Sequence, residues 1–205
     1  MEKIVVMTKA KFGIRDIMTA AAMIVLCVAV NMIIGTITLP VPILYLYFSA
    51  GMEGFLGAVF YLVVANRINK HGLLLIWSTI FGLIQLISGY AFMLPYFVLL
   101  GALAELIMIG ENSYRKPVRN AIGWGVYTAG MFIGIAVPLW WAWDSYSEMA
   151  LNSGFTVQTL DMQLNMVKSP GLMILGSVIS LVLAVLGIMF GQRLLRKHFQ
   201  KAGVV

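Results

Sequence analysis

A single carboxylate, Glu53, lies near the middle of a hydrophobic run that extends from residue 43 to residue 65. A charged side chain at the centre of a membrane-spanning helix costs roughly 2.5–3.5 kcal/mol, so such a group usually faces a bundle interior or a cavity. Two roles for Glu53 stay open. It is either a polar lock that joins helices, with Gln85 or Asn31 as partner, or the floor of a pocket that favours a cargo with a donor or a positive charge.

Further polar and aromatic residues lie towards the ends of neighbouring apolar runs. Small-molecule pockets are mostly apolar with a few polar anchors, and this set has that character. The candidate binding residues are Asn31, Glu53, Gln85, Tyr90, Met93, Tyr96, Trp140, Trp141, Trp143 and Asp144. The three tryptophans cannot all face one way on a helix, so each either stacks on a flat ligand or belongs to an interfacial aromatic belt.

Several kinds of chemistry have no motif in this sequence. There is no G-x-x-x-x-G-K-[ST] loop for ATP hydrolysis, and neither H-E-x-x-H nor paired cysteines for zinc, so we expect no metal and no cofactor. Cys27 is the single cysteine, which excludes an intrachain disulfide. His71 and His198 each lie close to lysines in polar segments, where solvated interfacial side chains are expected. A transport or binding role therefore outranks an enzyme.

The composition indicates the environment that must hold these residues. Of the 205 residues, 61% are hydrophobic and 11% are charged, and the mean hydropathy is +0.94. A soluble domain of this size carries far more charge. The net charge of +6 does not indicate nucleic-acid binding, because the positive residues lie between hydrophobic segments. We expect an integral membrane protein with one domain, in contact with the lipid bilayer and with no nucleic-acid partner.

The apolar runs are close to the 20 residues that span about 30 Å of hydrocarbon. They predict an all-α membrane protein, a compact bundle of six transmembrane helices in a single domain over residues 1–205. The third and fourth runs share a very short turn, so they form an antiparallel pair, and a long outer loop covers about 143–170. The predicted spans are 16–35, 43–65, 72–89, 91–109, 119–141 and 171–192.

The basic residues predict the orientation. Of the 14 Lys and Arg residues, 13 lie before the first span, in the connections after the second and fourth spans, or after the sixth span; Lys168 is the exception. The positive-inside rule then places both termini in the cytoplasm of a multi-pass cell-membrane protein. The candidate binding residues fall in the outer half.

Small residues recur at helical spacing, which in lipid permits close helix packing. Most such stripes are expected to pack inside the bundle. The first span carries the better candidate for docking on a separate membrane subunit, formed by Ala21, Ala22, Val25 and Ala29. Glu105, near the inner end of the fourth span, is expected to pair with Arg115, Arg119 or a basic residue of a partner.

Four stretches carry a family resemblance. They are LPYFVLLGALAELI (94–107), YRKPVRNAIGW (114–124), PLWWAWDSYSE (138–148) and GQRLLRKHFQKAGVV (191–205). With the span pattern, they resemble the substrate-binding S components of energy-coupling-factor (ECF) ABC transporters, in the group labelled Trep_Strep. The resemblance implies a small six-helix subunit that captures a micronutrient from outside. It then docks on a transmembrane coupling subunit driven by two cytoplasmic ATPases and topples to release its cargo.

The resemblance also bears on individual residues. Many S components meet the coupling subunit through an A-x-x-x-A motif on the first helix. Here the register is Ala21, Val25 and Ala29, which departs from that motif at its second position. Members that carry nickel or cobalt use a histidine near the amino terminus, which this chain lacks, so those metals are disfavoured.

The first hypothesis is therefore an S component that captures a vitamin-like or other micronutrient. The leading cargo class is a flat aromatic heterocycle. A tetrapyrrole such as haem is the alternative, although the outer half has no histidine to bind iron. Two rival hypotheses are a self-sufficient secondary transporter or channel, against which the lack of an internal repeat counts, and a membrane scaffold with no cargo.

Overall fold

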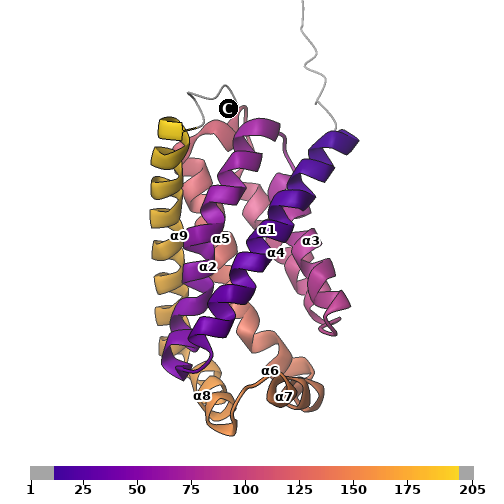
Figure 1. Ribbon diagram of the computed structural model, residues 1–205, viewed down its shortest axis with the longest axis vertical. Helices are drawn as coiled ribbons and strands as arrows, with labels where there is room; N and C mark the ends of the chain where they lie inside the picture. Colours follow the sequence, from indigo (N-terminus) through magenta and orange to yellow (C-terminus); the bar gives the residue numbers. More distant parts are fainter. Residues whose placement is uncertain (1–11, 199–205) are drawn as a thin grey trace, which may run out of the picture.

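The computed structural model describes residues 12–198, and these residues form helices with no strand (Figure 1). The predictions that involve Lys3, Lys9, Lys11 and the tail beyond residue 198, including Lys201, lie outside the described residues. The elements are α1 (Ile14–Thr38), α2 (Pro42–Ile68), α3 (Leu73–Ile87), α4 (Met93–Ile107), η1 (Ser113–Arg115), α5 (Pro117–Ile133), η2 (Gly134–Ala136), α6 (Val137–Trp141), α7 (Trp143–Asn152), α8 (Val157–Lys168) and α9 (Pro170–His198).

Four helical segments within residues 12–198 are long and apolar enough to cross a membrane: α1, α2, the continuous segment Pro117–Trp141, and α9. They coincide with four of the six predicted spans. Helices α3 and α4 have 15 residues each, which gives about 22 Å of length at 1.5 Å per residue. That is shorter than a typical hydrocarbon core, so the membrane crossing of this antiparallel pair stays a prediction.

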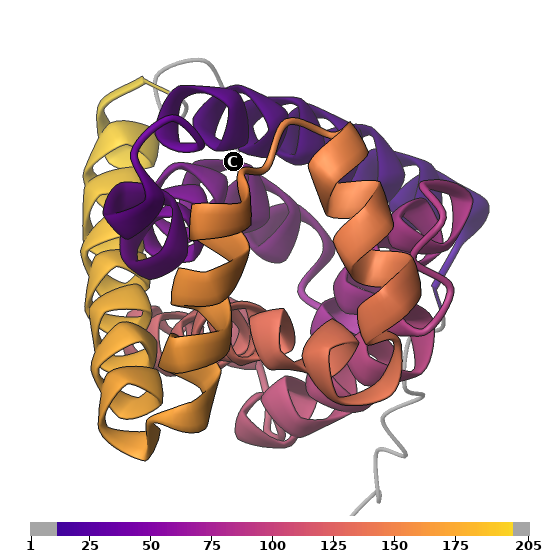
Figure 2. The same cartoon turned by 90° about the horizontal axis from the view of Figure 1, so that it is seen from below.

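The predicted outer loop at 143–170 is wrong in one respect, because most of it folds into α7 and α8. Thr156 caps α8 by accepting a hydrogen bond from the backbone N–H of Thr159 at 3.1 Å. Tyr146, Ala150 and Leu160 form a small buried cluster between the two helices. These two short helices lie across one end of the bundle, as seen from below in Figure 2.

The helical segment that follows η1 contains a short 3₁₀ turn before it reaches α7. Helix α5 ends at Ile133, a 3₁₀ turn follows, and α6 begins at Val137. Pro138 lacks a backbone N–H and its ring crowds the carbonyl of the preceding turn, which accounts for the break. The helical path ends at Ala142, whose φ of −150° and ψ of 37° separate α6 from α7.

Glycines allow the long helices to approach closely, as expected from their spacing. A Cβ atom added to Gly187 of α9 would lie 2.5 Å from the carbonyl oxygen of Phe55 on α2. A Cβ atom at Gly54 would lie 2.3 Å from the Thr128 side chain on α5. In lipid, helices associate through such close packing because hydrophobic burial contributes little. These two glycines therefore serve packing inside the bundle.

The two ends of the bundle differ in character. The first described turn of α1 and the last of α9 lie at one end, and α7 and α8 lie at the other (Figure 1). Arg15, Arg67, Arg115 and Arg196 belong to helix ends and connections at the first end. The orientation in which this basic end faces the cytoplasm stays a prediction of the positive-inside rule.

Cysteine labelling tests that orientation in a Cys27→Ser background. We expect Ser145→Cys on α7 and Asn165→Cys on α8, both exposed positions, to react with a membrane-impermeant maleimide applied to intact cells. Glu111→Cys, in the exposed connection after α4, is expected to react only after the membrane is opened. The reverse pattern would overturn the orientation and the outward-facing site together.

Candidate binding site

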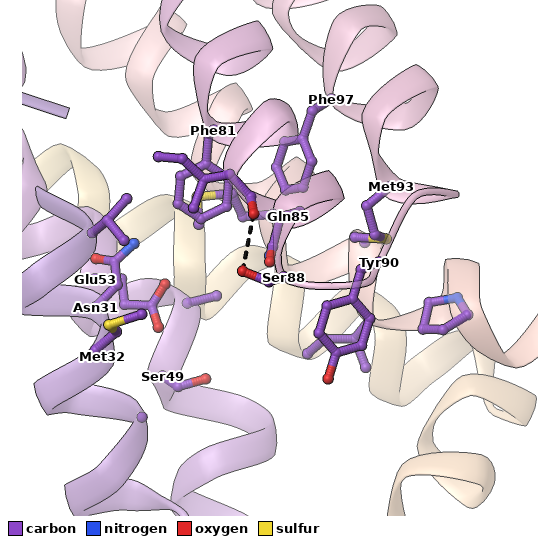
Figure 3. Close-up of a pocket in the computed structure, with 18 of the residues that line it drawn as sticks. Asn31, Met32, Ser49, Glu53, Phe81, Gln85, Ser88, Tyr90, Met93 and Phe97 are labelled. Atoms are coloured by element: carbon purple, nitrogen blue, oxygen red, sulfur yellow. Dashed lines mark hydrogen bonds between the residues drawn. The ribbon is translucent and has the colours of Figure 1, made fainter. Parts of the chain in front are cut away.

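A cavity of about 340 Å³ lies between the helices in the half of the bundle nearer α7 and α8 (Figure 3). Its volume falls in the range of small-molecule sites, which is roughly 300–1,000 Å³. Three helices each present a face at helical spacing: Val28, Asn31 and Gly35 on α1; Tyr45, Ser49 and Glu53 on α2; Phe81, Gln85 and Ser88 on α3. The remaining lining residues include Tyr90, Phe92, Met93, Phe97, Met131, Gly134, Ile135, Pro138, Tyr146, Phe155 and Gln163.

Several polar groups of the cavity have no hydrogen-bond or ion-pair partner among the described residues. Among residues 12–198, no hydrogen bond or ion pair reaches the Glu53 carboxyl or the Gln85 amide, and the Oδ1 atom of Asn31 is buried without a donor. Figure 3 shows Glu53 and Asn31 on one side of the cavity and Gln85 and Ser88 on the other. The polar lock from Glu53 to Gln85 or Asn31, one of the two roles considered from sequence, is therefore not formed.

Below Glu53 the bundle is filled by aromatic side chains that sequence reasoning did not single out. The indole N–H of Trp124 donates to the carbonyl oxygen of Gly54 at 2.8 Å, and Trp124 stacks on Tyr61 at 4.6 Å between ring centroids. Tyr127 is buried beside them. It lines, with Asn31 and Glu53, a crevice of about 10 Å³, close to the volume of one water.

The cavity is covered by a hydrogen-bonded connection between α7, α8 and η2. The Tyr146 hydroxyl donates to Oε1 of Gln163 at 2.9 Å, and Nε2 of Gln163 donates to the carbonyl oxygen of Ile135 at 3.3 Å. Burial raises the pKa of Tyr146 to about 12, so the phenol keeps its proton and acts as the donor. A groove of about 810 Å³ beside this cover shares four lining residues with the cavity: Met32, Gly35, Tyr45 and Phe155.

The structure brings together half of the binding residues expected from sequence. Asn31, Glu53, Gln85, Tyr90 and Met93 all line the cavity. They come from α1, α2, α3, the α3–α4 turn and α4, so residues far apart in the sequence meet around one space.

The other five expected residues do not line the cavity. Tyr96 donates its hydroxyl to the carbonyl oxygen of Gly130 at 2.5 Å. Trp140 and Trp141 are 64% and 74% exposed. Trp143 packs against the α7–α8 cluster, and Asp144 is exposed. Trp143 and Asp144 follow the departure from helical geometry at Ala142 (φ −150°, ψ 37°), which starts α7 across the end of the bundle.

Several lining residues were missing from the sequence-based set. Phe81 and Phe97 contact each other at 4.9 Å between ring centroids. Phe81 lies four residues before Gln85, and Phe97 lies four residues after Met93, a spacing that places each pair on one helix face. That spacing was a usable signal. Phe155 and Gln163 lie in the segment that was predicted as a loop, so no helical face was assigned to them.

At the opposite end, Glu105 shows how a well-satisfied carboxylate is held. It accepts from the backbone N–H groups of Gly72 at 2.7 Å and Leu74 at 3.1 Å and from the Tyr114 hydroxyl. The expected pairing with Arg115 or Arg119 is therefore wrong; His71 Nδ1 lies 3.8 Å away. The Arg119 side chain instead donates to the carbonyl oxygens of Ile107 and Ile109. Glu105 thus joins α4 to the start of α3 and to η1.

The docking stripe expected on the first helix faces mostly away from the bundle. Ala22 and Ala29 are exposed, Val25 is 59% exposed, and Ala21 is half-buried. The opposite face of α1, with Ala20 and Ile24, is fully buried.

Within residues 12–198, no group of three His, Cys, Asp or Glu side chains is placed to hold a metal ion.

Comparison with known proteins gives one match. Residues 14–201 match the model of a family described as a hypothetical bacterial integral membrane protein (Trep_Strep). No curated protein and no solved structure matches the chain.

The two interior carboxylates, Glu53 and Glu105, predict opposite effects on stability. Because Glu53 has no hydrogen-bond or ion-pair partner among the described residues, Glu53→Leu should not lower the melting temperature of the cargo-free protein in detergent. Glu105→Leu removes the acceptor of three donors and should cost about 1–3 kcal/mol for each donor left unpaired, with a clearly lower melting temperature. Equal destabilisation by both changes, measured by thermal unfolding, would show that Glu53 holds the bundle together.

Proposed function

The chain belongs to the Trep_Strep family of bacterial integral membrane proteins, and we propose that it is the substrate-binding S component of an ECF-type importer. In this role it captures a micronutrient from outside the cell. It then docks on a transmembrane coupling subunit that two separate cytoplasmic ATPases drive. The resemblance in sequence suggests this class of protein, and the geometry of the cavity is the independent support for it.

One observation carries the proposal: unpartnered polar groups surround a cavity inside a membrane protein. Within the described residues the Oδ1 atom of Asn31 is buried without a partner, which costs on the order of 1–3 kcal/mol. The Glu53 carboxyl and the Gln85 amide line the same cavity and have no hydrogen bond among these residues. A cargo that brings hydrogen-bond donors removes this cost. The arrangement therefore suits a binding protein better than a scaffold without cargo.

The walls favour a flat, partly polar cargo. Phe81, Tyr90 and Phe97 supply aromatic surface beside the polar floor, which suits an aromatic heterocycle. A volume of about 340 Å³ is near the lower limit for small-molecule sites and favours a vitamin-like molecule over a tetrapyrrole. A haem iron would also need methionine or tyrosine ligands here, because no histidine lines the cavity.

The outward face of α1 supports docking on a partner. Its exposed small residues, Ala22 and Ala29, would let another helix approach closely. This face lies on the other side of α1 from the buried Ile24. A partner can therefore cover it without displacing a helix of the bundle.

Mass spectrometry of small molecules carried through gentle purification tests the binding role and identifies the cargo. We expect Glu53→Gln to retain about five-fold less cargo per protein, because a contact with a carboxylate is stronger than a neutral hydrogen bond by about 1 kcal/mol. Trp141→Ala, which changes an exposed residue outside the cavity, should retain the wild-type amount. Unchanged retention in Glu53→Gln, or a wild-type protein that carries no small molecule, would contradict the proposed site.

The coupling role predicts a separation of binding from transport. Ala22→Trp should leave cargo retention intact and abolish uptake by cells, because an indole on the outward face of α1 would hold a docking helix several Å away. Leu99→Trp, at a position 66% exposed on α4, is the matched control and should transport normally. Equal loss of retention and uptake in Ala22→Trp would contradict docking on this face. Uptake by liposomes that contain this purified chain alone would favour a secondary transporter instead.

A further inference from the structure

A second cleft, of about 220 Å³, lies at the basic end of the bundle, far along the helices from the cargo cavity. Helices α2, α5 and α9 and the 3₁₀ turn η1 form it, and it shares no lining residue with that cavity. Its lining is predominantly polar. The residues are Leu62, Asn66, Arg115, Pro117, Asn120, Gln192, Leu195 and Arg196.

The two arginines bring positive charge that the cleft does not neutralise. Within residues 12–198, no ion pair or side-chain hydrogen bond involves Arg115 or Arg196, and no Asp or Glu lines the cleft. Arg119 differs, because its guanidinium already donates to the carbonyl oxygens of Ile107 and Ile109. As far as the described residues go, the cleft therefore presents two guanidinium groups whose donors are not used by another side chain.

Buried hydrogen bonds fix the wall beside Arg115. Asn120 is 2% exposed; its Oδ1 accepts from the Tyr61 hydroxyl at 2.8 Å, and its Nδ2 donates to the carbonyl oxygen of Tyr114 at 2.7 Å. These bonds tie the residue before Arg115 to α5 and α2. On α9, Gln192 lies one turn before Arg196, and within the described residues its amide makes no hydrogen bond. The cleft thus combines a fixed wall with three side chains able to donate to an anion.

We propose that this cleft binds the phosphate group of an anionic phospholipid. A guanidinium presents two parallel N–H donors that match phosphate oxygens, and basic pockets between transmembrane helices are suited to anionic head groups. The floor formed by Leu62 and Leu195 is apolar and buried. A phosphate at the rim would therefore contact the arginines above this apolar floor.

The exposed surface of α9 favours a lipid over free phosphate. Met189 lies seven residues before Arg196, so both side chains belong to the same helix face about two turns apart. Met189 is 47% exposed, and Val182, a further seven residues towards the centre of the bundle, is 48% exposed. This apolar strip begins below the cleft and provides a surface for acyl chains that extend from a head group held at the rim.

The proposal is tested on the purified protein in a neutral detergent. The separate probes are dioleoyl phosphatidylglycerol, dioleoyl phosphatidylcholine and inorganic phosphate. Native mass spectrometry measures their retention, and thermal unfolding measures the stabilisation that each gives. We expect retention and stabilisation by phosphatidylglycerol only. The double variant Arg115→Gln/Arg196→Gln should bind it about ten-fold or more weakly, since each lost charge-assisted contact contributes substantially and 1.4 kcal/mol is ten-fold.

The matched control is Arg193→Gln/Lys197→Gln, which removes the same charge from exposed side chains of α9 that do not line the cleft. It should bind phosphatidylglycerol within about two-fold of wild type, a difference near 0.4 kcal/mol. Equal weakening by both double variants would show attraction to general surface charge and overturn the cleft as the site. Arginine-dependent binding of inorganic phosphate without phosphatidylglycerol binding would overturn the lipid assignment.

Discussion

A bilayer offers no hydrogen-bond partners, and most of this structure follows from that constraint. Backbone groups are satisfied within helices, and several buried side chains find partners in neighbouring helices. Trp124 donates to Gly54, Tyr96 donates to Gly130, and Glu105 accepts from Gly72 and Leu74. Against this background, the missing partners of Glu53 and Asn31 mark the cavity as the place where the protein leaves polar groups for another molecule to satisfy.

The same constraint explains how the cavity stays open. Close contacts at Gly187 and Gly54 hold α2, α5 and α9 together, while α1 crosses α2 diagonally (Figure 1). Helices α7 and α8 cover the end of the cavity through the hydrogen bond from Tyr146 to Gln163. The packed helices thus supply rigidity, and the short helices supply a cover. A site placed on packed helices keeps its side chains in position better than one on loops.

The sequence was informative where a polar residue interrupts a long apolar run. Glu53, Asn31 and Gln85 each stand out for that reason, and each lines the cavity. The tryptophans near α6 were harder to place, because aromatic side chains suit both a lipid interface and a ligand wall. In the structure Trp140 and Trp141 are exposed and do not line the cavity. Residues such as Gln163 were missed because α8 is short and amphipathic, so its helix depends on contacts with Tyr146 that the local pattern does not reveal.

An experimental structure of the protein purified with its cargo tests the central claim most directly. The account predicts non-protein density in the cavity between α1, α2 and α3, with a donor atom of the cargo within hydrogen-bond distance of the Glu53 carboxyl and of Asn31 Oδ1. A cargo bound instead against Trp140 and Trp141, or a cavity in which Glu53 turns to bond another side chain, would contradict it.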